Sequence, residues 1–440
     1  METKETTLKA NSVSKFDVII MAISAAAPVM CLASSLGDIM SGAGTAAALA
    51  FLLATVVLIM VGSSYGQLSA KYNSAGGTYA YVRSVFGEKA GFVAAWLNMG
   101  VTICTGVIGA VFTTYLHELV PAIPLWAGPV ILLVPIFFIG WRGVEMSTKT
   151  LILVWFVQMA LIIYPAIRIW GMQAAEIENV LANSAQAFVP SFGLSGLMLG
   201  VLVCVWCYVG FECPAYMGEE LRGGNKAVKF AIPVSAIGIG IIYVISCWLW
   251  TAGMDKESFA AVLGSGTLMV DYCKLVGYTM GGNLVCVAAL VSCIGCFIAF
   301  STSSPRGFFD MGRNGYLPAA TAKVNQHQTP HVSLILYSVL WLAAALYGTY
   351  GNMAHLFTFM ALFASATYIM VCAANIKDRW KETGAKAFLQ NKIIPLIAIA
   401  ILVYMIVSSD STSLLLAGIW LLGCIIAAFI WHAVRKTSKR

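Results

Sequence analysis

The sequence predicts an all-α integral membrane protein with twelve transmembrane helices. Its 440 residues are 60% hydrophobic and only 10% charged, whereas soluble domains carry about 25% charged residues. The mean hydropathy is +0.85, and the apolar segments are too many and too long for one soluble core. Basic residues recur between these segments in an alternating pattern. These three observations favour a polytopic membrane protein that forms one domain, 1–440.

The predicted spans follow one another along the whole chain. No long soluble insertion separates them, and the longest outer loop, 253–283, has room for short helices. An inner segment, 312–331, contains turn signals and is expected to be a loop. The spans are predicted at 17–40, 43–68, 86–116, 125–141, 149–171, 195–218, 228–252, 284–311, 332–350, 353–374, 391–408 and 411–433.

The distribution of positive charge predicts the orientation. If both termini are cytoplasmic, all but three of the 26 Lys and Arg residues, from Lys4 to Arg440, fall on the inner side. The exceptions are Arg168, Lys256 and Lys274. Because cytoplasmic loops carry the excess of Lys and Arg, twelve spans with both termini inside are expected. The net charge of +7 then reflects topology and gives no support to nucleic-acid binding. Compact loops favour the plasma (inner) membrane of a prokaryote.

Two predicted spans contain features that break a helix. Glu212 lies in the apolar stretch 201–218, between Gly210 and Pro214, and a carboxylate at that depth is costly unless it has a function or a partner. Pro28 interrupts the opening span in the same way. Five spans separate the two, so helices 1 and 6 run in opposite directions. Such a pair is typical of an inverted-repeat transporter; the alternative for each helix is a simple proline kink.

Four blocks of sequence, residues 67–83, 86–97, 208–222 and 306–330, carry a family resemblance. Together they resemble the amino acid–polyamine–organocation (APC) superfamily. The resemblance implies the LeuT-like fold, a five-plus-five inverted repeat with broken helices 1 and 6. It places the first repeat at 17–171, the second at 195–374 and accessory spans at 391–433. It also implies a secondary transporter that moves amino acids by alternating access, with amines or polyamines as the alternative cargo.

The two predicted breaks supply the candidate substrate site. Unwound helix ends offer amide hydrogens that favour a carboxylate and carbonyl oxygens that favour an ammonium, and an amino acid has both groups. Many members of the family have a Gly-Ser-Gly-like break in helix 1, whereas this chain has Ala-Ala-Ala-Pro. Proline contributes no amide hydrogen, so an amine without a carboxylate stays open. The candidate substrate-binding residues are Ala26, Ala27, Pro28, Val29, Trp206, Gly210, Phe211, Glu212 and Phe300.

Trp206 and Glu212 are the candidates for gating and proton coupling. Trp206 matches the aromatic gate of antiporters in the superfamily, and the face of an indole can take an ammonium; the alternative is packing. Glu212 has three interpretations: contact with a substrate ammonium, acceptance of a coupling proton, or a cap on the broken helix. Phe300 is expected to form a second apolar wall or to pack in the core.

The expected coupling partner is a proton, or a counter-substrate in exchange, with sodium as the alternative. Some proton-coupled relatives carry a lysine in span 5 at a place where sodium binds elsewhere. The matching position here is Gln158, which cannot carry the charge. Ser301 and Thr302 are the candidate cation site, although hydroxyls on a membrane helix more often bond their own backbone.

The remaining chemistry-bearing residues give no catalytic or metal pattern. The cysteine pairs 204/207 and 293/296 lie inside predicted spans without histidine or acidic neighbours at ligand spacing, so neither a metal nor a cofactor is expected. The sequence contains no His-Glu-x-x-His motif and no paired intramembrane aspartates, which would be the signs of an enzyme. A channel or nutrient receptor on the same fold stays as an alternative. The expected partners are a small-molecule substrate, the coupling species and the lipid bilayer.

Charged residues at the inner face are expected to pair across loops. Arg306, Arg313 and Lys71 are the cations, and the predicted partners are Glu219, Glu220 and Asp310. Such pairs would form an inner gate or would simply fasten the loops.

Overall fold

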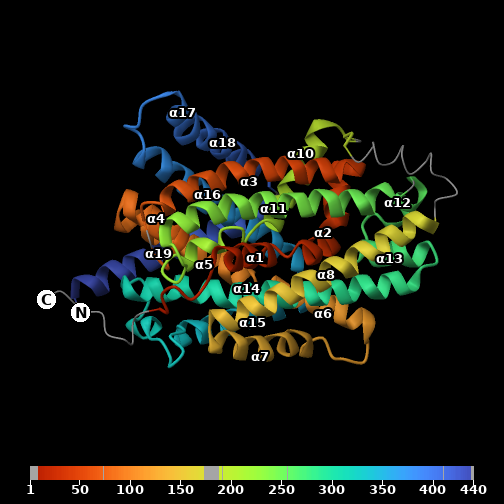
Figure 1. The fold of residues 1–440 in the computed structure, drawn as a ribbon, viewed down its shortest axis with the longest axis horizontal. Helices are drawn as coiled ribbons and strands as arrows, with labels where there is room; N and C mark the ends of the chain where they lie inside the picture. Colours follow the sequence, from red (N-terminus) through yellow and green to blue (C-terminus); the bar gives the residue numbers. More distant parts are fainter. Residues whose placement is uncertain are drawn as a thin grey trace.

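Figure 1 shows an all-helical molecule whose long helices run side by side. The computed structural model describes residues 8–72, 74–172, 188–190, 192–254, 256–409 and 411–437; Lys4 and Arg440 lie outside them. The helices are α1 (Lys15–Ala25), α2 (Pro28–Ala43), η2 (Gly44–Ala46), α3 (Ala47–Ser69), α4 (Gly77–Phe86), α5 (Glu88–Cys104), α6 (Val107–Leu119), α7 (Ala127–Arg142), α8 (Val144–Met172), α10 (Gly193–Cys207), η4 (Cys213–Met217), α11 (Gly224–Ala252), α12 (Lys256–Val262), α13 (Leu268–Leu275), α14 (Thr279–Arg313), η5 (Ala319–Ala322), α15 (His331–Tyr350), α16 (Met353–Asp378), α17 (Ala385–Phe388), η6 (Leu389–Ile393), α18 (Ile394–Val407) and α19 (Ser411–Thr437).

The described chain contains eight helical runs that are long and apolar enough to cross a membrane. Three shorter apolar helices, at 127–142, 193–207 and 413–429, accompany them. The first run, Lys15–Ser69, has 55 residues, whereas one crossing needs about 20 residues of helix. An all-α, multi-pass membrane protein is thereby confirmed, while the count of twelve spans stays a prediction.

The opening helix is interrupted where its sequence forbids regular hydrogen bonding. α1 ends at Ala25, Ala27 takes a left-handed conformation with φ 44° and ψ 60°, and Pro28 occupies the first turn of α2. Proline is suited to that position because its missing N–H has no helical partner there. Ala26 and Ala27 therefore form the interruption, whereas Pro28 and Val29 already belong to α2.

A second interruption follows α10. The helix ends at Cys207, and the chain continues through turns to the short 3-10 helix η4, with Gly210 at φ 110°. Only glycine adopts such a φ without steric cost. A Cβ atom at Gly210 would also lie 2.7 Å from the Cβ of Ala25. Glycine is thus required here both for the turn and for the close approach of the two interruptions.

Small residues bring α2 and α10 close together. A Cβ atom at Gly42 of α2 would come within 2.9 Å of the amide nitrogen of Gly200 in α10, and one at Gly200 would lie 2.7 Å from the Cβ of Ala43. Membrane helices use such residues because lipid gives no hydrophobic drive for association, so close packing must supply it. α2 and α10 therefore pack as one unit.

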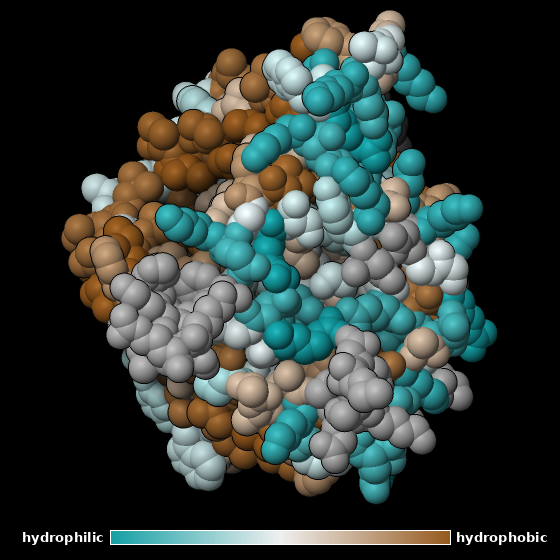
Figure 2. Space-filling model, turned by 90° about the vertical axis from the view of Figure 1, so that its left-hand side faces the viewer, coloured by the Kyte–Doolittle hydropathy of each residue, from teal (hydrophilic) through white to brown (hydrophobic). Residues whose placement is uncertain are grey.

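The surface divides into a hydrophilic end and hydrophobic flanks. Figure 2 looks onto the end where α4 lies in Figure 1 and shows hydrophilic residues across it, with hydrophobic ones beside them. On the flank, Leu153, Phe156 and Ile167 of α8 are 67%, 62% and 55% exposed. Exposed apolar surface of this extent marks contact with a membrane or another protein, and the multi-pass fold points to lipid.

Candidate functional site

The two interruptions share a hydrogen-bond donor in the interior of the molecule. The hydroxyl group of Tyr243, on α11, lies 2.7 Å from the carbonyl oxygen of Ala26 and 2.8 Å from that of Cys207. These oxygens belong to the break after α1 and to the last turn of α10. A side chain from a third helix thus joins the two places where helical hydrogen bonding stops.

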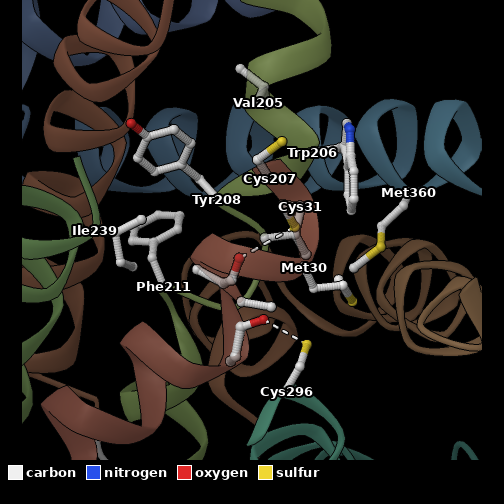
Figure 3. Packing of buried hydrophobic residues seen from close by; sticks show 14 of the residues in the cluster. Met30, Cys31, Val205, Trp206, Cys207, Tyr208, Phe211, Ile239, Cys296 and Met360 are labelled. Carbon is white, nitrogen blue, oxygen red and sulfur yellow. Dashed lines mark hydrogen bonds between the residues drawn. The ribbon is translucent and has the colours of Figure 1, made fainter. Parts of the chain in front are cut away.

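Other helices take further backbone groups that the interruptions release. The Cys296 thiol of α14 donates to the carbonyl oxygen of Ala25 at 3.0 Å, as Figure 3 shows. The amide of Met30, in the first turn of α2, donates to the hydroxyl of Ser292 at 3.0 Å. Backbone groups inside a membrane need partners because water is absent. These side chains let the chain leave the helical path at that depth.

Glu212 is hydrogen-bonded within the second interruption and to α16. Its Oε2 atom accepts the amide hydrogen of Gly210 at 3.0 Å and the hydroxyl hydrogen of Tyr368, on α16, at 3.2 Å. The residue is 6% exposed, so these two donors replace the hydration that the carboxyl group loses. The carboxyl group thus holds the turn between α10 and η4, whereas its side chain makes no capping hydrogen bond to η4. The cap on a broken helix, contact with a substrate and acceptance of a coupling proton stay predictions.

Trp206 is stacked and has an unused donor. Its ring lies on Phe357 of α16, with centroids 4.3 Å apart and planes at 23°. The residue is 3% exposed, and its Nε1 atom has no hydrogen-bond partner among the described residues. Figure 3 shows the indole on the side of Met30 and Met360, away from Phe211. A buried indole N–H usually finds a partner, so this one is available to a ligand or water.

The two candidate phenylalanines lie in different surroundings. Phe300 of α14 covers the second interruption, with its Cζ atom 3.2 Å from the position that a Cβ at Gly210 would take. Phe211 packs edge-on against Tyr65 of α3, with centroids 6.0 Å apart. The structure therefore brings Phe300 to the break, while the Phe211 ring points away from Trp206.

The hydroxyls of the candidate cation site bond their own helix. Ser301 and Thr302 both donate to the carbonyl oxygen of Ile298, at 3.0 and 2.7 Å. The guanidinium of Arg306 donates to the carbonyl oxygen of Thr302, and a positive charge there opposes a second cation. Gln158 of α8 is 1% exposed, and neither polar atom of its amide has a partner among the described residues. Sodium binding stays untested.

An ion-pair network joins the loop after η4 to the last part of α14. Arg306 pairs with Glu220, and each side chain is 2% exposed. Arg313 pairs with Glu219 and, at 2.6 Å, with Asp310. A buried pair that loses one partner leaves an uncompensated charge, so separation of these elements is costly. The predicted pairing of both arginines with these acids is confirmed.

Lys71 takes a different partner from those predicted. Its ammonium lies 2.6 Å from Asp378 at the end of α16, which also accepts the hydroxyl of Tyr72 at 2.8 Å. The hydrogen bond to Asp378 raises the pKa of Lys71 above its ordinary value. The prediction that Lys71 joins Glu219, Glu220 or Asp310 was wrong, because α16 packs beside the end of α3 and supplies a nearer acid.

The start of the described chain is fastened to the same network. The amides of Ser12 and Val13 donate to the carbonyl oxygen of Glu220 at 2.9 and 3.3 Å, and the amide of Arg222 donates to Val13 at 2.9 Å. Val13 and Leu221 form an isolated β-bridge. The segment before α1 thus adds a short strand-like contact to the loop after η4.

Sequence reasoning missed the side chains that support the interruptions. Tyr243, Tyr368, Ser292 and Phe357 lie on helices that looked like ordinary apolar spans. A buried tyrosine or serine in a membrane helix signals a hydrogen bond across the bundle, and that signal could have marked Tyr243 and Ser292. It could not have named their partners.

Comparison with known proteins agrees with this architecture. Residues 13–431 match the family model described as "Amino acid permease". The chain is 24% identical to a methylthioribose transporter of Bacillus subtilis, over 87% of this chain and 84% of that protein. It is 20% identical to a branched-chain amino acid permease of the same organism, over 90% and 87%. It is 21% identical to a low-affinity putrescine importer of Escherichia coli, over 67% and 66%. The chain therefore belongs to the amino acid permease family of membrane transporters.

Proposed function

We propose that this protein is a secondary transporter of amino acids that works by alternating access. The observation that carries the proposal is the contact between two interrupted helices, joined by Tyr243, in a chain of the amino acid permease family. Broken helices at the midplane are where transporters of this kind build their substrate sites. Ala26, Ala27, Gly210 and the rings of Trp206 and Phe300 then surround the substrate.

The proposed architecture is the LeuT-like one, with twelve spans. The first repeat is 17–171, the second 195–374, and 391–433 holds the accessory spans. α1 with α2 and α10 with η4 are the two broken helices. The hydrophilic end in Figure 2 and the basic residues around it support a cytoplasmic assignment for that end and for both termini. The plasma membrane is the proposed location.

The backbone at the first interruption is better equipped for an ammonium than for a carboxylate. The carbonyl oxygens of Ala25 and Ala26 sit at the break and are held by a thiol and a hydroxyl that a substrate could displace. On the amide side, Pro28 has no N–H and Met30 is bonded to Ser292. This observation favours amines as the second candidate cargo, and one relative is a putrescine importer.

Proton symport or substrate exchange is the proposed coupling. Glu212 is a buried carboxyl group at the second interruption, where a proton or a substrate ammonium would alter its bond to Tyr368. The Arg306 guanidinium on the Thr302 carbonyl argues against sodium at Ser301 and Thr302. Trp206 and Phe357 would form the aromatic gate over the substrate.

Uptake into liposomes tests the function. The purified chain is given ornithine or leucine, and separately putrescine or isoamylamine, which are the same molecules without the carboxylate. Each probe is offered with a pH gradient, a sodium gradient or internal unlabelled substrate. Uptake of the amino acid but not of its amine supports amino acid transport, and the reverse supports amine transport. Absence of uptake and exchange for every pair would overturn the transporter proposal.

A further inference from the structure

A pocket at the end of α16 has lysines in its wall. Its volume is about 590 Å³, and it is formed by the last turns of α16 and the residues just beyond them. Figure 1 shows α17 and α18, which follow this segment, at the edge of the bundle. The lining residues are Ala373, Ile376, Lys377, Asp378, Trp380 and Lys381.

The acids beside this pocket already have partners of their own. Asp378, in the pocket wall, pairs with the ammonium of Lys71 at 2.6 Å. Glu382, a few residues further along, accepts a hydrogen bond from the guanidinium of Arg379 and another from the amide of Asn391, each at 2.7 Å. Neither acid therefore cancels the charge of the other basic residues at this corner.

The lysines of the corner form an excess of positive charge. Lys377 and Lys381 line the pocket, and both are exposed. Lys386 of α17 and Lys392 of η6 follow them along the chain. Among the residues that the structure describes, none of these four lysines forms an ion pair. The pocket is therefore suited to a ligand of negative charge.

Exposed apolar side chains accompany this positive charge. Trp380 and Phe388 are 63% and 53% exposed, and the ammonium of Lys392 lies 5.0 and 5.7 Å from the centroids of their rings. α18 continues from the same corner and exposes Leu396 by 57% and Ile397 by 42%. Lysines and an aromatic ring next to an apolar flank are what membrane proteins present to the headgroups and acyl chains of lipids.

We propose that this pocket binds the headgroup of an anionic phospholipid, with Lys377 and Lys381 as its charge partners and the flank of α18 beside its acyl chains. A soluble anion would gain from the lysines but not from the apolar flank, so the two features together favour a lipid. Arg379, between the two lysines, donates to the carbonyl oxygen of Gln67 at 3.1 Å. A lipid in the pocket thus lies beside a contact that joins α16 to α3.

Binding is measured on the full chain in detergent. Phosphatidylglycerol and phosphatidylcholine with the same acyl chains are titrated separately, and bound lipid is counted by native mass spectrometry. Lys381→Gln is the main variant, because the Lys381 side chain makes no ion pair or ring contact with a described residue. Lys381→Arg keeps the charge. Lys386→Gln is the matched control, because Lys386 is exposed on the same segment and does not line the pocket.

The wild type should bind phosphatidylglycerol more tightly than phosphatidylcholine. Lys381→Gln should weaken the binding of phosphatidylglycerol about fivefold, as for the loss of one lysine near an anionic headgroup, whereas Lys381→Arg and Lys386→Gln should bind it as the wild type does. The melting temperature without added lipid shows that each variant is folded.

Three outcomes would overturn the lipid site. The first is equal binding of the two lipids. The second is an equal loss in Lys386→Gln, which would mean diffuse surface charge only. The third is competition by glycerol phosphate, the headgroup fragment without acyl chains, at the same concentration as the lipid, which would identify a soluble anion as the ligand.

Discussion

At the scale of single residues, the hydroxyl hydrogen of Tyr243 is shared between two carbonyl oxygens. A tyrosine hydroxyl has one hydrogen to donate, yet Tyr243 lies within hydrogen-bond distance of the carbonyl oxygens of Ala26 and Cys207. The Ala26 oxygen also has the thiol of Cys31 3.4 Å away, so it keeps a donor when the Tyr243 proton goes to Cys207. When the proton goes to Ala26, the Cys207 oxygen loses this donor. An oxygen in that state attracts an ammonium or a water molecule, so we expect Tyr243 to contribute to transport as well as to structure.

Tyr243→Phe should therefore impair transport more than stability. Loss of the hydroxyl should cost about 1–3 kcal/mol, the usual penalty for an unsatisfied buried group. The rate of transport should fall further than this loss of stability explains, because both interruptions lose their shared hydrogen-bond donor. Tyr337→Phe is the control, since the buried hydroxyl of Tyr337 is bonded to Thr105, between α5 and α6. Equal transport in the two variants, measured as initial uptake in liposomes, would contradict the role of Tyr243.

Glu212→Gln separates the hydrogen bond to the turn from the proton. A glutamine oxygen can still accept the amide of Gly210, so the fold should survive with a loss of no more than about 2 kcal/mol, the scale of one hydrogen bond to a charged group. Because glutamine does not titrate, the uptake rate should depend less on pH than in the wild type. A pH profile that matches the wild type would remove the proton role and leave the hydrogen bond.

The sequence predicted the breaks but not their supports, for a physical reason. Proline, glycine and a buried acid act on the backbone within a few residues, so the effects of Pro28, Gly210 and Glu212 can be recognised from the neighbouring sequence. The hydroxyl partners cannot be recognised in this way, because Tyr243 is 217 residues from Ala26 and Tyr368 is 156 residues from Glu212. Contacts at that separation depend on how the helices pack, which no local pattern records.

At the scale of elements, α2 and α10 form one body. Gly42, near the end of α2 that is far from its interruption, and Gly200 of α10 let the two backbones touch. Because both interruptions lie at the other end of this pair, the pair can tilt without breaking its own contact. We expect that opening and closing of the site moves α2 and α10 together against α14 and α16.

Gly42→Ala should disturb this body. Its Cβ would lie 2.9 Å from the Gly200 amide nitrogen, so the helices must separate, at a cost of about 1–3 kcal/mol, typical of overpacking. Gly418→Ala in α19 is the control, because nothing lies within 4 Å of that position. The thermal melting point should fall for Gly42→Ala and stay level or rise for Gly418→Ala. Equal melting points would show that α2 and α10 do not depend on this contact.

At the scale of the whole molecule, ion pairs at the hydrophilic end link distant segments. Arg313 holds Glu219 and Asp310 together, and Asp310 also accepts the hydroxyl of Tyr79 in α4. Without the arginine the two acids would repel each other. The network thus holds these segments together, and the buried Arg306–Glu220 pair makes their separation costly.

Arg313→Gln should shift the molecule towards an open inner end. The expected readout is faster alkylation of Cys213, a buried thiol at the start of η4, by a maleimide, followed by peptide mass spectrometry. Lys71→Gln removes another ion pair at this end, but one whose lysine is 53% exposed and worth under about 1 kcal/mol. The rate should rise about tenfold for Arg313→Gln, as for loss of a partly buried pair worth about 1.4 kcal/mol. The same rate in both variants would contradict a gate at Arg313.

The backbone contact between Val13 and Leu221 has a practical consequence. Because the segment before α1 is tied to the loop after η4, we expect a tag fused to the start of the chain to pull on that loop. A tag after α19 has no such connection to η4 among the described residues. A fluorescent reporter of the transport cycle should therefore be fused to the amino terminus. A purification tag that leaves the cycle undisturbed should be fused to the carboxy terminus.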